Sequence, residues 1–123
     1  MTEKKILVIS GTHGNELNPI WGVNKFKDIN KDTLKLRSLE FTIGNPKAVQ
    51  SGSRYIDVDL NRSFNKFNNV SNQNSYEVNR AQFLKDEYGF QGSKACSTAI
   101  DLHTTTSGMG SSIVMYGRRE KDF

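Results

Sequence analysis

Two histidines and one glutamate stand where they could share a metal ion. The chain contains two histidines, His13 and His103, and Glu16 follows His13 by three residues in the segment GTHGNE. Two imidazoles and one carboxylate leave the fourth position of a tetrahedral zinc ion to water, which is the arrangement of catalytic zinc sites. Histidines at these positions can equally be hydrogen-bonded structural residues, so the spacing alone leaves both interpretations open.

A second polar cluster, in the segment RYIDVDLNR, carries side chains that bind carboxylates. Its charged and amide residues are Arg54, Asp57, Asp59, Asn61 and Arg62. A guanidinium group binds a carboxylate through two parallel hydrogen bonds, and an asparagine offers both a donor and an acceptor. The cluster therefore suits an anionic substrate, although the same residues can instead pair with each other in a solvated loop.

Two other kinds of chemistry are weakly supported. The segment 10–14 could cradle an anion at a helix start, but it lacks the Walker lysine and the GxGxxG spacing, so nucleotide binding is not favoured. Cys96, the single cysteine, has no neighbouring histidine in the sequence and is interpreted as a half-buried small residue rather than a nucleophile. A single cysteine forms no intramolecular disulfide, which agrees with a reducing compartment.

The composition bounds the class of protein. A chain of 123 residues with 35% hydrophobic and 24% charged residues predicts one globular domain with a thin core. No apolar run is long enough to cross a membrane, and residues 1–5 lead into a short apolar run without a cleavage site, so a cytoplasmic protein is expected. The net charge of +4 favours anionic partners. The basic residues are scattered and match no nucleic-acid-binding motif, so neither nucleic acid nor a membrane is an expected partner.

Strands and helices alternate along the chain. The patterns predict strands over 5–10, 38–44, 97–102 and 111–116, and helices over 17–29 and 75–89. The continuous apolar run 5–10 is typical of a strand buried on both faces. Ala48 and Val49 add a short further piece, and 52–74 is expected to be mostly loop.

This alternation predicts a mainly parallel α/β sheet flanked by helices. His13 follows the first strand, and His103 follows the strand over 97–102. Ligand sites of open α/β sheets gather at the carboxyl ends of their strands, so both histidines are expected at one edge.

Three motifs in this order carry a resemblance to a known family. GTHGNE at 11–16, RYIDVDLNRSF at 54–64 and DLHTTTSGMG at 101–110 resemble the aspartoacylase family, which is related to succinylglutamate desuccinylases and more distantly to zinc carboxypeptidases. YEVNRAQ at 76–82 resembles the family's connecting helix, so the similarity extends over nearly the whole chain. The resemblance implies a zinc carboxypeptidase-like α/β fold.

The resemblance also implies roles for the polar residues. His13, Glu16 and His103 would bind one catalytic Zn²⁺ per chain, which activates a water molecule and polarises the amide carbonyl. Arg54 would be catalytic by stabilising the oxyanion and would also contact substrate. The remaining assignments are Asn61 and Arg62 as binders of the substrate carboxylate, and Asp101 and Asp59 as carboxylates that orient a metal ligand, with a structural role favoured for Asp59.

The implied reaction is hydrolysis of an N-acyl-L-aspartate, such as N-acetylaspartate, to a carboxylate and aspartate. Other N-acyl amino acids and succinylglutamate stay open as substrates, as does a homo-oligomeric state. Family members are much longer, and their general-base glutamate lies in a later portion that nothing here matches; Glu120 is not assigned to that role. Residues 1–123 are therefore expected to be the N-terminal portion of one amidohydrolase domain, truncated before the second half of the sheet and the C-terminal β-rich domain. The alternative is a non-catalytic fragment that binds zinc or an anion.

Overall fold

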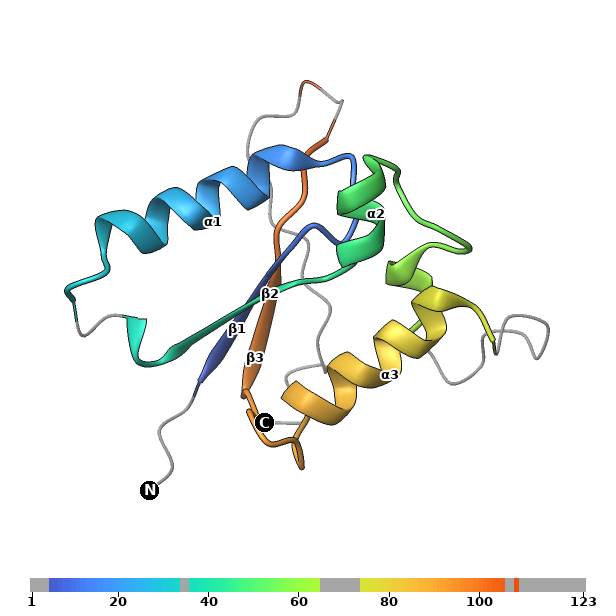
Figure 1. Cartoon of the computed structure of the whole chain (residues 1–123). Helices are drawn as coiled ribbons and strands as arrows, with labels where there is room; N and C mark the ends of the chain where they lie inside the picture. Colours follow the sequence, from blue (N-terminus) through green and yellow to red (C-terminus); the bar gives the residue numbers. More distant parts are fainter. Residues whose placement is uncertain (1–4, 34–35, 65–73, 106–107, 109–123) are drawn as a thin grey trace.

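A parallel sheet forms the centre of the computed structural model, which describes residues 5–33, 36–64, 74–105 and 108. Its three strands are β1 (Ile6–Ser10), β2 (Leu39–Ile43) and β3 (Thr98–Asp101), in the order β2-β1-β3 (Figure 1). Both pairings of β1 are parallel. The prediction of a mainly parallel α/β sheet is confirmed, and the strand predicted over 111–116 lies outside the described residues.

Two long helices agree with the prediction. α1 spans Leu17–Ile29 and α3 spans Tyr76–Tyr88. The Ser75 hydroxyl accepts a hydrogen bond from the Val78 N–H at 3.3 Å, which satisfies one of the free donors at the start of α3. A polar cap before an amphipathic segment is therefore sufficient to locate this helix from sequence.

Ala48 and Val49 belong to a helix, α2 (Pro46–Ser51). The Asn45 side chain accepts from the Ala48 N–H at 3.1 Å, and Gly52 ends the helix with a left-handed φ of 65°. Proline is also well suited to a first helical position. In the described part of the long loop that follows, residues Leu60–Arg62 form a short 3₁₀ helix, η2.

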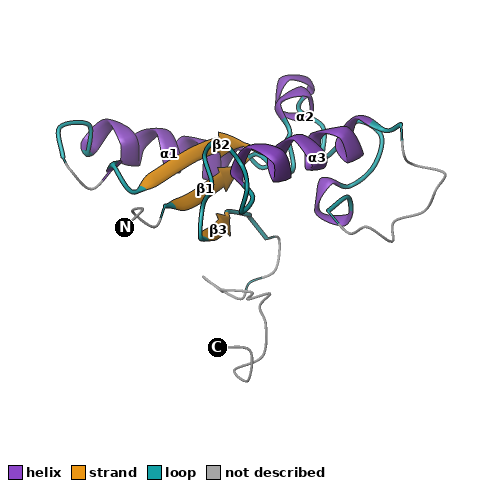
Figure 2. Ribbon diagram, turned by 90° about the horizontal axis from the view of Figure 1, so that it is seen from below, coloured by secondary structure: helices purple, strands orange, loops and turns teal. Residues whose placement is uncertain are grey.

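The packed interior of the described residues is small. Leu60 on η2 packs with Ala81 and Leu84 of α3, against partly buried Phe64 and Tyr88. In β1, Leu7 and Ser10 are buried and point to opposite faces, whereas the other three residues are half-buried, so the predicted burial on both faces is only partial. All four residues of β3 are exposed, and this strand forms the edge of the sheet on the side away from α2 (Figure 2).

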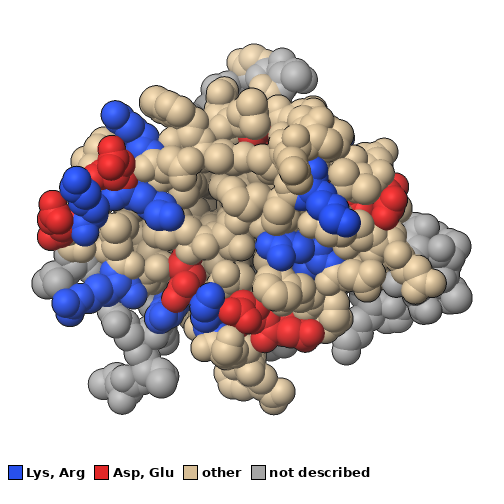
Figure 3. Space-filling model, in the orientation of Figure 1, with Lys and Arg blue, Asp and Glu red and all other residues tan. Residues whose placement is uncertain are grey.

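Helix length and surface charge bear on the predictions about membranes and nucleic acid, which stay predictions. Within the described ranges, none of the helices is long and apolar enough to span a membrane. On the face seen in Figure 3, basic and acidic side chains alternate rather than gather into one basic patch.

Candidate metal centre

The loops that follow β1 and β3 bring both histidines together. Gly11, with φ 68°, turns the chain at the end of β1, and His13 and Glu16 follow in the loop before α1. His103 lies two residues beyond the end of β3. The ring centroids of the two histidines are 4.9 Å apart. The carboxyl ends of parallel neighbouring strands thus deliver both rings to one place.

Glu16 lies between the two imidazoles. Its Oε1 is 2.7 Å from His13 Nδ1, and its Oε2 is 3.3 Å from His103 Nδ1. One ligand atom from each of the three residues lies within 4.8 Å of the others. Ligand atoms around a tetrahedral zinc ion with ordinary bond lengths lie about 3.4 Å apart. The three side chains therefore fit a metal ion with only small adjustments.

Each histidine has an aspartate on its other ring nitrogen. His13 Nε2 lies 3.1 Å from Asp59 Oδ1, and His103 Nε2 lies 2.8 Å from Asp101 Oδ2. A carboxylate that accepts a hydrogen bond from the Nε2–H group favours the tautomer in which Nδ1 has a free lone pair for a metal. Both Nδ1 atoms face Glu16, so the two aspartates support the same ligand geometry.

The carboxylates at this site are held in their charged form. Burial by itself would raise the pKa of Glu16, but hydrogen bonds from the Thr104 N–H and His13 outweigh it, and the net pKa is lowered. Asp59 behaves in the same way: burial opposes its charge, while His13 and the Asn61 N–H lower its pKa overall. The cluster is consequently anionic, which favours a bound cation.

His103 has the opposite tendency. Its hydrogen bond to Asp101 raises its pKa above the ordinary value, an effect that exceeds the lowering by burial. The same aspartate that orients the ring therefore also favours its protonation. A metal ion and a proton must compete for His103 as the pH falls.

The predicted substrate-binding residues differ in their closeness to this cluster. Arg54 is half-exposed, with Nη2 at 3.5 Å from Asp59 Oδ2 and Nη1 at 3.9 Å from Glu16 Oε1. Asn61 reaches the cluster through its Nδ2, which is 3.3 Å from His103 Nε2. Arg62 is exposed on η2 and forms no ion pair with a described residue. The structure thus brings Arg54 and Asn61, but not Arg62, into contact with the candidate ligands.

Sequence reasoning missed two buried polar residues near the site. Thr12, which is buried, donates a hydrogen bond from its hydroxyl to Asp101 Oδ1 at 2.7 Å. Glu77 is fully buried and accepts hydrogen bonds from the loop that carries Arg54 and Asp59. Both residues lie inside segments that resemble the family, and this resemblance was the only feature of the sequence that pointed to them.

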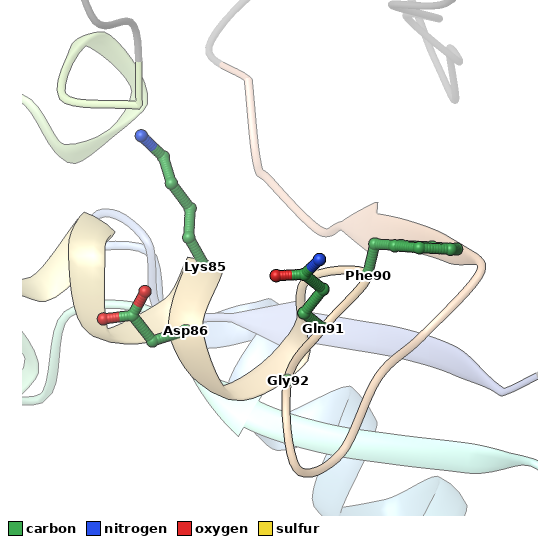
Figure 4. A pocket seen from close by; sticks show the side chains of 5 residues that line it. All are labelled: Lys85, Asp86, Phe90, Gln91 and Gly92. Carbon is green, nitrogen blue, oxygen red and sulfur yellow. The ribbon is translucent and has the colours of Figure 1, made fainter.

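Two other features lie apart from the candidate metal centre. Cys96 is half-buried, as predicted, and burial raises the pKa of its thiol, which disfavours a nucleophilic thiolate. A separate surface hollow lies at the C-terminal end of α3 (Figure 4). Its lining residues are Lys85, Asp86, Phe90, Gln91 and Gly92. None of the candidate ligands contributes to it.

The parallel sheet and the His-Glu-His cluster beyond its carboxyl edge define an α/β protein of the zinc carboxypeptidase-like class. Within that class the match is specific. Residues 2–123 match the succinylglutamate desuccinylase/aspartoacylase catalytic domain, and the chain belongs to this family.

Individual relatives agree with this assignment. A protein of Prochlorococcus marinus subsp. pastoris described as "probable aspartoacylase" is 57% identical over the whole chain, which covers 41% of that relative. The crystal structure of murine aminoacylase 3 is 28% identical with a TM-score of 0.61, covering 84% of this chain and 36% of that one. A succinylglutamate desuccinylase from Vibrio parahaemolyticus has a TM-score of 0.65 and 25% identity, covering 85% of this chain and 37% of that one. The chain therefore spans about two fifths of the length of the relatives it matches.

Proposed function

We propose that this chain carries the zinc-binding part of an enzyme that hydrolyses the amide bond of an N-acyl-L-aspartate, such as N-acetylaspartate, to a carboxylate and aspartate. One observation carries the proposal: the Nδ1 atoms of His13 and His103 face the two oxygens of Glu16, at 2.7 and 3.3 Å. Family membership supports the same reaction class.

Each residue of the cluster has a role in this proposal. His13, Glu16 and His103 hold the zinc ion, which when bound supplies an activated water and a polarised carbonyl. Asp59 and Asp101 keep the imidazole rings in the ligating tautomer.

Residues at the rim act on the substrate. The Arg54 guanidinium stabilises negative charge that develops on the carbonyl oxygen, an effect that strengthens as water is excluded. Asn61 and Arg62 bind the carboxylate of the amino-acid part. The substrate is therefore a small anion, and other N-acyl amino acids or succinylglutamate are the alternatives to N-acylaspartate. A chain with one cysteine suits the reducing cytoplasm, where we place this reaction.

A second candidate function is zinc or anion binding without turnover. The observation in its favour is that each carboxylate described at the cluster contacts an imidazole, so none of them is placed to act as a general base. Loss of general-base catalysis alone typically slows a reaction by about 10²–10⁴-fold. A chain lacking that group would keep its metal affinity and lose most of its turnover.

Zinc binding tests the metal centre directly. Titration of metal-free protein should reach about one zinc per chain, and His103→Ala should weaken binding by more than about 100-fold because a ligand is lost. Glu87→Gln is the control, since Glu87 pairs with Lys94 at 3.2 Å and not with the cluster. Wild-type protein that takes up no zinc would overturn the proposal.

Turnover then separates the two candidate functions. Zinc-loaded protein that releases aspartate from N-acetylaspartate supports the hydrolase. Full zinc occupancy without release supports the binding function, and release that appears only when the chain is extended by the remaining part of a relative would assign the missing chemistry to that part.

A further inference from the structure

We propose that Glu77 is a positioning residue, which holds the loop bearing Arg54 and Asp59 against the candidate metal centre. The inference rests on the proposed zinc site, but Glu77 itself lies outside it, on α3. Four hydrogen bonds, an anchored helix and the contacts of the loop carry the argument.

The Glu77 carboxylate is fully buried and accepts four hydrogen bonds. Oε1 accepts from the Ile56 N–H at 2.6 Å and from Asn45 Nδ2 at 3.0 Å. Oε2 accepts from the Asp57 and Val58 N–H groups at 3.0 and 3.2 Å. Three successive backbone N–H groups converging on one anion form a binding site for negative charge, and here the chain fills it with its own carboxylate.

The connection between the loop and α3 runs in both directions. The Asp57 carboxylate accepts a hydrogen bond from the Tyr76 N–H at 2.8 Å, at the first residue of α3. One turn further along, the Arg80 guanidinium donates to the carbonyls of Ile43 and Gly44 at 2.8 and 2.9 Å. The helix that presents Glu77 is therefore fixed to the end of β2, so the loop is held relative to the sheet.

The segment held by Glu77 separates the two loop residues that reach the metal centre. Asp59 follows Val58 directly and meets His13 Nε2 at 3.1 Å. Arg54 precedes the segment by two residues, and its carbonyl accepts a hydrogen bond from the Gly14 N–H at 3.3 Å. Loss of the Glu77 contacts would therefore loosen the loop on both sides of residues 56–58, next to Arg54 and next to Asp59. A shift of the loop by about 1 Å would lengthen the Asp59–His13 contact beyond hydrogen-bonding distance.

Only an ionised carboxylate satisfies all four donors. Its two oxygens offer about four lone-pair sites, whereas a glutamine of the same shape replaces one oxygen by an NH₂ group that faces other donors. Glu77→Gln therefore keeps the volume, removes the charge and leaves two of the four donors without an acceptor. Glu87→Gln is the matched control, because it makes the same change on the same helix at an ion pair with Lys94.

Two measurements test the inference. In metal-free protein, amide hydrogen exchange at residues 56–58 should accelerate about tenfold or more in Glu77→Gln, while amides of β1 keep their protection. Zinc affinity should fall by about 10–100-fold, as expected when the partner of a metal-binding histidine is displaced. The control variant should match wild type in both measurements.

The outcomes distinguish this inference from the proposed function. Wild-type protein that binds no zinc overturns the metal site, whereas wild type and Glu77→Gln that bind zinc equally tightly overturn the positioning role of Glu77. Faster exchange spread evenly over the sheet and the loop also overturns it, because Glu77 would then act only on overall stability. If Glu77→Gln does not fold, Glu77→Asp is the second variant: it keeps the charge but is shorter by one methylene, so its carboxylate no longer reaches all of the N–H groups of residues 56–58. Unchanged zinc affinity in that variant overturns the inference, and a loss of affinity with β1 still protected supports it.

Discussion

Each candidate ligand histidine has the same two neighbours, Glu16 on Nδ1 and an aspartate on Nε2. For His13 that aspartate is Asp59, at 3.1 Å, and for His103 it is Asp101, at 2.8 Å. The repetition places both Nδ1 atoms at one carboxylate, which is the arrangement that a shared metal ion requires. A carboxylate partner also makes the imidazole a better electron donor to a metal.

Replacement of Asp59 tests this reading at the scale of one residue. Asp59→Asn should lower zinc affinity by about 10–100-fold, because the neutral amide supports the ligating form of His13 less well. Competition with a chromophoric zinc chelator measures the change. Asp86→Asn is the control, since Asp86 is exposed on α3 and accepts from Gln82 at 2.8 Å. Equal affinity in both variants and wild type would assign Asp59 a structural role only.

Sequence reasoning identified the candidate ligands but not all of their supports. Asp101 and His103 are two residues apart, and the resemblance implied that Asp101 orients a metal ligand, which agrees with the contact at 2.8 Å. The positions of Thr12 and Glu77 in the sequence have no comparable spacing relative to their hydrogen-bond partners. Three of the four donors to Glu77 are backbone N–H groups 19 to 21 residues away, and their direction depends on the path of a loop rather than on side-chain types.

At the scale of the elements, the turn between β1 and α1 depends on close backbone packing. A Cβ at Gly14 would lie 2.0 Å from the Ala48 carbonyl carbon in α2, a distance that no real contact shows. The loop that carries His13 and Glu16 can therefore reach its position only because this residue has no side chain. α2 was not recognised as a helix from sequence, since it has six residues and too few apolar positions for a period.

Alanine at Gly14 should displace the loop or α2. We expect Gly14→Ala to lower the free energy of unfolding by about 3 kcal/mol and to weaken zinc binding, because the clash is with backbone atoms. Gly22→Ala is the counterpart within α1, where a Cβ meets nothing within 4 Å. That variant should be more stable by roughly 0.5–1 kcal/mol, since alanine favours helix over glycine. Urea unfolding measures both, and a Gly14→Ala protein as stable as wild type would contradict the packing argument.

At the scale of the whole molecule, buried polar residues are as numerous as buried hydrophobic residues in the described part of the chain. Six buried hydrophobic residues stand beside six buried polar or charged ones, among them Asn45 and Glu77. β3 leaves all four of its residues exposed, and the chain spans 41% of the length of a relative. The thin core was predicted from composition. The burial of Glu77, which holds the loop beside the core, was not predicted. A glutamate near the start of a helix is ordinarily exposed to solvent.

This reliance on Glu77 should make stability depend on pH. Burial opposes the charge of Glu77, but hydrogen bonds from Ile56, Asn45, Val58 and Asp57 lower its pKa below the ordinary value of 4.5. A carboxyl whose pKa is lower in the folded than in the unfolded chain stabilises the fold above the unfolded pKa, and this contribution is lost as the pH falls through the folded pKa.

The comparison of wild type with Glu77→Gln isolates that contribution from those of other acidic groups. At pH 7, the variant should be less stable by roughly 2–4 kcal/mol, because it loses hydrogen bonds to a buried charge. Below the ordinary pKa of 4.5, the difference should shrink, since the glutamic acid of the wild type becomes neutral as well. The Asp57 carboxylate, which accepts from the start of α3, and the Arg80 guanidinium, which donates to the Gly44 carbonyl, are present in both proteins. Urea midpoints measured from pH 7 to pH 3 give the difference directly.

The control variant Glu87→Gln should differ from wild type in stability by a nearly constant amount over this range. A constant difference for Glu77→Gln would mean that the Glu77 carboxyl does not hold the loop through its charge.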